Sequence, residues 1–154
     1  AAVARLAKGA GSQGMVLGQA HDLAGDARDR DAVLAVHHRK TGCLLRTASA
    51  LGGILAGATT DELARVEQFA SELAIAFQAL DDLLDTTAST EQLGKPAGSD
   101  EARDLPTLFG LLGPIGCRVL IEEHTDKALR LLEEDHPAEA RLGALTRWMM
   151  KRDH

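Results

Sequence analysis

Apolar residues recur at spacings of three and four along almost the whole chain, which is the period of an amphipathic α-helix. This pattern predicts a first helix over most of residues 1–24, which glycines at positions 9, 11, 14 and 18 interrupt or thin, and then a polar loop over residues 25–31. A second helical region is predicted over about 32–57, with a break at Thr41-Gly42. No stretch shows the alternation of a half-buried strand.

The second half of the chain contains the longest predicted helix, from about residue 61 to residue 86. Thr60 is its expected N-cap, because a Thr hydroxyl can accept a hydrogen bond from the first turn and two acidic residues follow it. The helical period is absent from residues 86–106, and a loop of this length is commonly functional or disordered. The remaining helices are predicted at about 106–113, at 114–134 and from Pro137 onward.

Composition supports helices that pack against one another in one domain. The chain has 154 residues, enough for a single domain with a real core, and it is 45% hydrophobic but only 3% aromatic. Ala and Leu dominate, which suits close-packed helices better than pleated sheets. Together with the helical period, this composition predicts an all-α fold.

Charge and hydropathy argue against nucleic-acid binding and against a membrane span. The formal net charge of −6 leaves no excess of Lys or Arg to displace counterions from a nucleic acid. No apolar run approaches the ~18 residues of a membrane span, and we expect no signal peptide at the start. A cytoplasmic protein is therefore expected.

The cysteines and the paired histidines do not predict a transition-metal site. Cys43 and Cys117 are far apart and form no metal-ligand or redox spacing, so two reduced cysteines are expected. His37 and His38 are adjacent, so their side chains point in different directions on a helix. We predict that both histidines are partly exposed and bind no metal.

Three aspartates lie close to the C-terminal end of the longest predicted helix: Asp81, Asp82 and Asp85. The helix dipole makes that end electronegative and Asp is a poor helix former, so the sequence is locally unfavourable there. Such local conflicts are frequent at functional sites. A solvated helix end is the simpler alternative, and for an arbitrary DDxxD segment on a helix it is the commoner one.

Helical spacing places these carboxylates beside the core-facing stripe of the helix. Gln78, Asp81 and Asp85 fall on one line, about one hundred degrees around the helix from that stripe. Small residues at positions 70 and 74 leave space beside the line. We therefore predict that these three polar residues line one side of a cavity. The core-facing stripe is expected to contain Val66, Phe69, Leu73, Phe77, Leu80 and Leu84.

The residues around this line predict a site for Mg²⁺ and a diphosphate. Carboxylates that border a cavity repel one another unless a cation joins them, and Mg²⁺ prefers hard oxygen ligands. Lys40 and Thr41 offer an ammonium and a hydroxyl, and we expect Lys40 to lie across the cavity from the aspartates. Lys95, in the segment LGKP, offers a second ammonium from a loop. The spacing of a Walker loop is absent.

In chain order, these motifs resemble a known family, the trans-prenyl diphosphate synthases of the geranylgeranyl and farnesyl diphosphate synthase type. The segments that carry the resemblance are GMVLGQAHDLAG, HHRKTGCLL, AFQALDDLLD, LGKPAGSD and PTLFGLLG. They cover essentially the entire chain, and their combination is highly specific. The resemblance implies an isoprenoid-synthase-type helical bundle that depends on Mg²⁺.

The resemblance also implies a role for each residue of the predicted site. Asp81, Asp82 and Asp85 match the family's last aspartate motif, which binds the Mg²⁺ that bridges to the allylic diphosphate. The residues expected to act in catalysis are Asp81, Asp82 and Lys40. The residues expected to bind the substrate diphosphate are Lys40, Thr41, Gln78 and Lys95, and Gln19 and Asp22 match the GQxxD stretch of a cavity-lining helix.

Two departures from the family pattern affect this prediction. The chain matches only about the C-terminal half of the pattern, so residues 1–154 are expected to be the C-terminal part of one helical domain. The first aspartate-rich motif, the residues that hold isopentenyl diphosphate and those that usually set product length belong to the other half. Leu105 also stands where the family commonly has a lysine, five residues after Asp100, unless Arg103 supplies that cation.

The leading hypothesis is a Mg²⁺-dependent prenyltransferase that condenses an allylic diphosphate with isopentenyl diphosphate once a complementary chain or fragment supplies the first aspartate-rich motif. An oligomer is expected, as is common in the family. Two alternatives stay open: a non-catalytic modulating subunit of a heteromeric synthase, which Leu105 slightly favours, and a class I terpene cyclase fragment. The intact aspartate motif and Lys95 favour the enzyme over the modulating subunit.

Overall fold

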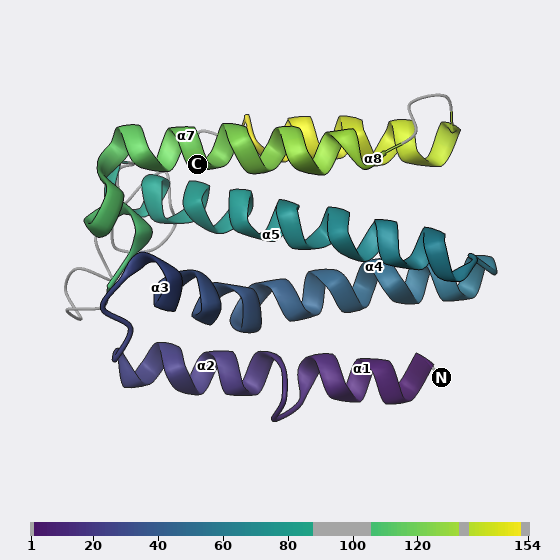
Figure 1. The fold of residues 1–154 in the computed structure, drawn as a ribbon, viewed down its shortest axis with the longest axis horizontal. Helices are drawn as coiled ribbons and strands as arrows, with labels where there is room; N and C mark the ends of the chain where they lie inside the picture. Colours follow the sequence, from purple (N-terminus) through teal and green to yellow (C-terminus); the bar gives the residue numbers. More distant parts are fainter. Residues whose placement is uncertain (1, 88–105, 133–135, 152–154) are drawn as a thin grey trace.

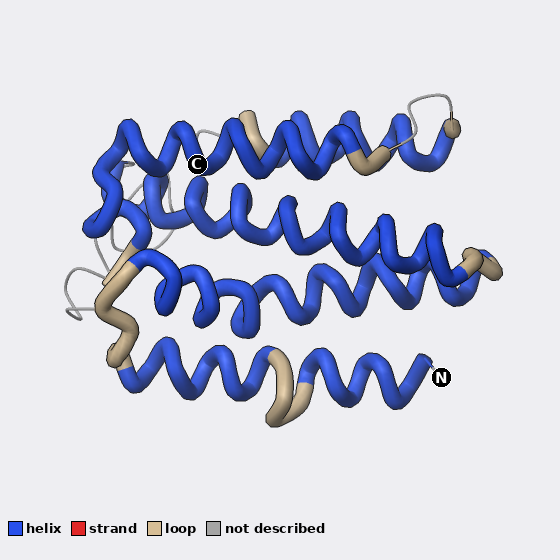
Figure 2. The backbone as a smooth tube through the Cα atoms, viewed as in Figure 1, coloured by secondary structure: helices blue, strands red, loops and turns tan. Residues whose placement is uncertain are grey.

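The computed structural model describes residues 2–87, 106–132 and 136–151, and within these ranges the chain consists of helices and loops without a strand (Figure 2). The predicted all-α class is therefore confirmed. No helix in the described ranges is long and apolar enough to cross a membrane. The elements are α1 (Ala2–Ala10), α2 (Met15–Ala24), α3 (Arg30–His37), the π-helical segment η1 (His38–Gly42), α4 (Cys43–Ala56), α5 (Thr60–Thr87), α7 (Leu108–Arg130) and α8 (Pro137–Met149).

The helices lie in rows that run roughly along one axis (Figure 1). α1 and α2 form an outer row, in which α1 packs against α4 and α2 packs against η1. α3, η1 and α4 form the next row, and α5 lies between that row and α7. Because α5 is covered on more than one side, its polar residues must find partners on several neighbouring elements.

The start of α5 is fixed by a capping box, in which a Thr at the N-cap and a Glu three residues later satisfy each other's backbone N–H groups. Glu62 N–H donates to the Thr59 hydroxyl at 3.3 Å, and the Glu62 carboxylate accepts the Thr59 N–H at 2.6 Å. The prediction of Thr60 as the N-cap is therefore wrong by one residue, because Thr occupies both positions. The hydrogen bond from the Thr59 backbone, more than any other contact, lowers the pKa of Glu62.

The two predicted helix breaks have different outcomes. The break at Thr41-Gly42 is wrong, because the chain stays helical from α3 to α4 and widens into η1. Single π turns inside helices occur frequently at functional sites. The division between residues 113 and 114 is confirmed, because Gly113 has φ 67° and ψ 177° and Pro114 then begins the longer part of α7.

Two clusters of buried apolar side chains form the core, and α5 contributes to both. Three residues of the predicted core-facing stripe are only partly buried, Val66, Phe77 and Leu84, whereas Ala76 and Ala79 are fully buried. The predicted stripe misses Ala76 and Ala79 because α5 packs on several sides. The first cluster contains Ala27, Val33, Ala79, Leu83, Leu108, Cys117 and Leu120, and the second contains Phe69, Ala70, Leu73 and Ala128.

Candidate functional site

The three aspartates of α5 have different surroundings. Asp81 is partly exposed, whereas Asp82 and Asp85 are each 5% exposed. Successive residues of a helix point about 100° apart, so Asp81 and Asp82 face different neighbours. The structure therefore separates one carboxylate that solvent reaches from two that are enclosed.

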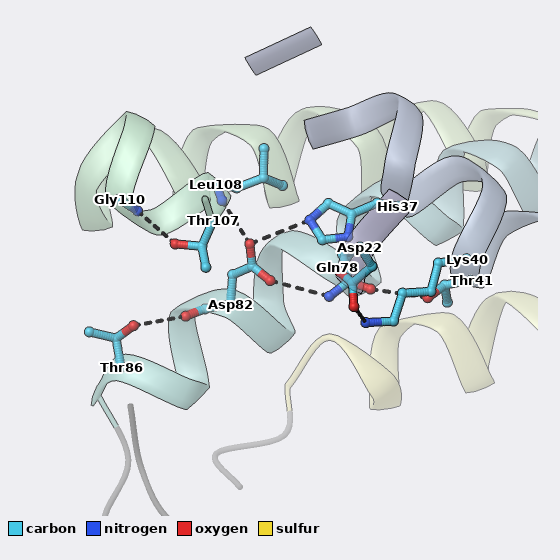
Figure 3. A network of polar contacts seen from close by, with 10 residues as sticks. All are labelled: Asp22, His37, Lys40, Thr41, Gln78, Asp82, Thr86, Thr107, Leu108 and Gly110. Carbon is cyan, nitrogen blue, oxygen red and sulfur yellow. Dashed lines mark hydrogen bonds and ion pairs between the residues drawn. The ribbon is translucent and has the colours of Figure 1, made fainter. Parts of the chain in front are cut away.

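The Asp82 carboxylate accepts two hydrogen bonds and lies close to the ring of His37 (Figure 3). Gln78 Nε2, one turn earlier in α5, donates to its Oδ1 at 3.2 Å. The backbone N–H of Leu108, at the start of α7, donates to its Oδ2 at 2.8 Å, and Nε2 of His37 lies 3.6 Å from the same oxygen. The first N–H groups of a helix have no partner within the helix, so Asp82 satisfies one of them in α7. A neighbouring helix thus compensates an acidic residue near the end of α5.

Thr41 and Gln78, both predicted to bind substrate, are in contact although 37 residues separate them. The Thr41 hydroxyl donates to Gln78 Oε1 at 3.1 Å (Figure 3). Thr41 lies in η1, which packs against α5, and Gln78 is 9% exposed. One chain of hydrogen bonds therefore runs from Thr41 through Gln78 and Asp82 to Leu108.

Lys40 forms an ion pair with Asp22, in the GQxxD stretch of α2. The Lys40 ammonium donates to Asp22 Oδ2 at 2.6 Å, and both side chains are partly exposed. Gly18 permits this approach, because a Cβ there would lie 2.2 Å from the backbone nitrogen of Lys40. α2 therefore packs directly on the backbone of η1, and Gln19, also in that stretch, is exposed.

The predicted partial exposure is confirmed for His38 but wrong for His37, which is 9% exposed. Neither ring nitrogen of His37 has a hydrogen-bond partner within the part of the chain that the structure describes. His38 Nε2 lies 2.9 Å from Nη1 of Arg46. Burial, and then the charges of Arg46 and Arg39, lower the pKa of His38, so its ring is neutral at neutral pH.

The thiol of Cys117 is buried close to the Asp82 carboxylate, and both conditions affect its pKa. Cys117 is fully buried, and this burial, together with the nearby Asp82 carboxylate, raises its pKa to about 11. The thiol is therefore protonated at neutral pH. Cys43 and Cys117 are both free, as predicted.

Asp81 is the carboxylate that fits the predicted Mg²⁺ best. Mg²⁺ usually keeps several of its waters and takes one or two protein carboxylates, so it needs a carboxylate that solvent reaches. Within the described ranges, no group of three or more His, Cys, Asp or Glu side chains is arranged to hold a metal ion. The binding of Mg²⁺ by Asp81, Asp82 and Asp85 stays a prediction. Lys95 and Leu105 lie outside the described residues.

Two partners of Asp82 were not predicted from the sequence: the ring of His37 and the N–H of Leu108. The spacing of four between Gln78 and Asp82 is visible in the sequence and indicates that these two side chains are neighbours on a helix. No sequence pattern indicates that the end of α3 and the start of α7 both meet α5 at this position.

The family model for polyprenyl synthetases matches residues 5–139 of the chain. A farnesyl diphosphate synthase from Geobacillus stearothermophilus is 34% identical over 154 residues, which cover 99% of this chain and 52% of that protein. A heterodimeric geranylgeranyl pyrophosphate synthase large subunit from Arabidopsis thaliana is 35% identical, covering 99% of this chain and 43% of that protein. The chain thus spans about half the length of the curated relatives it matches.

Solved structures have the same helical bundle, and this chain again matches about half of their length. The crystal structure of a geranyltransferase from Helicobacter pylori, complexed with magnesium and isoprenyl diphosphate, has a TM-score of 0.86 at 25% identity and covers 98% of this chain and 52% of its own. Heptaprenyl diphosphate synthase from Staphylococcus aureus has a TM-score of 0.85 at 20% identity, and the match covers 91% of this chain and 57% of that one. The predicted type of bundle is confirmed, and the chain accounts for about half of it.

Proposed function

The chain belongs to the polyprenyl synthetase family, and from this premise we propose that it forms the Mg²⁺- and diphosphate-binding half of a trans-prenyl diphosphate synthase. The reaction joins an allylic diphosphate to isopentenyl diphosphate. The observation that supports this best is the contact between Thr41 and Gln78, which brings η1 to the end of α5 that carries the aspartates. Two segments that match diphosphate-binding motifs therefore lie side by side.

The charged groups of the site have separate tasks in this proposal. Asp81, the carboxylate that solvent reaches, would hold the ion, and Lys40 adds a positive charge that the Asp22 carboxylate keeps in place. When bound, Mg²⁺ supplies positive charge to the diphosphate that leaves the allylic substrate. Lys95 is proposed to add a further ammonium.

The reaction requires little acid–base chemistry from the chain. The C–O bond to the allylic diphosphate breaks, the allylic carbon forms a C–C bond with isopentenyl diphosphate, and the product loses one proton, which the released diphosphate accepts. The chain therefore contributes placement and charge stabilisation, which groups fixed before the reaction provide most effectively.

A complementary part completes the active site in this proposal, in the same polypeptide or in a second one. Apolar side chains of the outer row, α1 and α2, are largely exposed, and Phe77 of α5 is only partly buried. Exposed apolar surface of this extent marks an interface, and an obligate interface is large and hydrophobic. We refer to the chain joined by that part as the assembly. The exposed side chains of the outer row include Val3 at 82%, Val16 at 51% and Leu23 at 68%.

Incorporation of labelled isopentenyl diphosphate by the chain, alone and mixed with a complementary half, tests this function. We expect no elongation by the chain alone and Mg²⁺-dependent elongation by the mixture, because the first aspartate-rich motif comes from the other half. Sedimentation should show that the two form a complex, and excess EDTA is the control. Elongation by the isolated monomer would exclude the composite site, and a stable complex without elongation would exclude the enzymatic function.

A further inference from the structure

We propose that Asp82 is a positioning residue and not a ligand of the metal ion: its enclosed carboxylate sets the direction of the hydrogen-bond chain that ends at Thr41. The inference rests on the proposed function and deepens it at one residue of the aspartate motif. It departs from the prediction that all three aspartates bind Mg²⁺.

Both carboxylate oxygens of Asp82 already accept hydrogen bonds from the protein. Gln78 Nε2 donates to Oδ1 and the N–H of Leu108 donates to Oδ2, while His37 Nε2 lies 3.6 Å from Oδ2. The residue is 5% exposed. Mg²⁺ gives up its waters reluctantly, so an ion at Asp82 would have to lose them in order to enter enclosed surroundings. The neighbouring Asp81 is partly exposed and faces other neighbours.

The direction of the chain follows from the chemistry of its members. A carboxylate only accepts hydrogen bonds, so Gln78 must turn its NH₂ group toward Asp82. The carbonyl oxygen of Gln78 then faces Thr41, whose hydroxyl must donate to it, as the structure shows. The hydroxyl proton of Thr41 is used in this bond, and the lone pairs of its oxygen are left for other partners. Asp82 thereby determines how Thr41 is oriented.

The same carboxylate joins elements that carry the rest of the site. Leu108 begins α7, and Thr41, which Asp82 reaches through Gln78, lies in η1 beside Lys40. A buried polar network fixes one arrangement when its members are satisfied. Asp82 therefore holds η1 and α7 in a fixed position against α5.

Asparagine at position 82 provides a test, because it has the same shape but replaces one acceptor with a donor. In Asp82→Asn, the remaining oxygen is needed by the N–H of Leu108, so the new NH₂ group faces Gln78. The amide of Gln78 must then rotate, and Thr41 must accept a hydrogen bond instead of donating one. Adding Gln78→Glu restores the original direction, because the new carboxylate at position 78 accepts from both position 82 and Thr41. The double variant also keeps the net charge and the shape of the pair.

In the assembly, Asp82→Asn is expected to lower kcat/KM for the allylic diphosphate by ~10–100-fold, the range known for partners outside a metal's ligand shell. The double variant should recover most of this loss. Mn²⁺ affinity in the presence of inorganic diphosphate, read from the EPR signal of free Mn²⁺, should be unchanged in Asp82→Asn. In the matched control Asp81→Asn it should fall by at least ~10-fold.

Loss of Mn²⁺ affinity in Asp82→Asn comparable to that in Asp81→Asn would overturn the proposal, and so would a double variant without recovery. Metal-free thermal unfolding of the chain separates this outcome from a failure of the proposed function. Gln78→Glu alone places two carboxylates side by side, so it should lower the midpoint temperature of unfolding. Adding Asp82→Asn should restore that midpoint. An assembly of wild-type chain that does not elongate would exclude the function, whereas an unrestored midpoint would exclude the pairing of Gln78 with Asp82.

Discussion

Replacing Asp81 with Asn is expected to lower Mg²⁺-dependent elongation by the assembly more than ~100-fold, because loss of a direct ligand should exceed the loss caused by partners outside the ligand shell. The chain should stay folded. The substitution removes one of three carboxylates near the electronegative end of α5, so the metal-free free energy of unfolding should stay unchanged or rise by ~0.3–1 kcal/mol. Elongation kinetics and unfolding in urea measure the two effects.

Asp126→Asn is a suitable control for Asp81→Asn. Asp126 lies on α7 with its side chain 66% exposed, and its pairing with Arg130, at 3.9 Å, is a surface contact of the kind that contributes little. Both elongation and stability should be unchanged in this variant. Normal elongation by Asp81→Asn would show that Asp81 does not hold the ion, and a large loss of its metal-free stability would show that it serves the fold.

Gly18→Ala is expected to damage both stability and activity. The added Cβ would lie 2.2 Å from the nitrogen and 2.6 Å from the Cα of Lys40, and backbone atoms cannot rotate away as a side chain can. α2 must therefore move off η1, at a cost of ~1–3 kcal/mol, which is usual for overpacking. Asp22 moves with α2 and leaves Lys40, so elongation should fall in parallel. Urea unfolding and elongation kinetics measure the two changes.

The same substitution at Gly52 in α4 provides the control. Gly52 is exposed, and no described atom that would contact its Cβ lies within 4 Å. Ala loses less backbone freedom than Gly in a helix interior, so Gly52→Ala should stabilise the chain by ~0.5–1 kcal/mol. If Gly18→Ala behaved in the same way, α2 would not pack on the backbone of Lys40.

The helices could be predicted because their signals are local. The period of 3.6 residues and the division at Gly113-Pro114 depend only on neighbouring residues, and the structure confirms them. The π turn depends on how α2 and α5 pack against it, whereas the local sequence at Thr41-Gly42 predicts a break. The N-cap of α5 was misplaced because Thr59 and Thr60 offer the same hydroxyl.

The candidate site could be predicted only in part. Helical period gives the angle between side chains around one helix, but not how many sides of that helix are covered. For this reason the sequence predicts a core position for Phe77 and does not predict the enclosure of Asp82. Thr41 and Gln78 were assigned to one site by the resemblance to the family, and the structure places them in contact. The approach of His37 to Asp82 depends on tertiary packing alone.

A crystal structure of the assembly with Mn²⁺ and inorganic diphosphate tests most directly whether this chain carries the metal- and diphosphate-binding half of the site. We expect an anomalous difference peak for Mn²⁺ at bonding distance from a carboxylate oxygen of Asp81, with the diphosphate between that ion and Lys40. Asp82 should still accept hydrogen bonds from Gln78 and Leu108. Ions bound only by the complementary part, with the diphosphate remote from Asp81 and Lys40, would contradict the account.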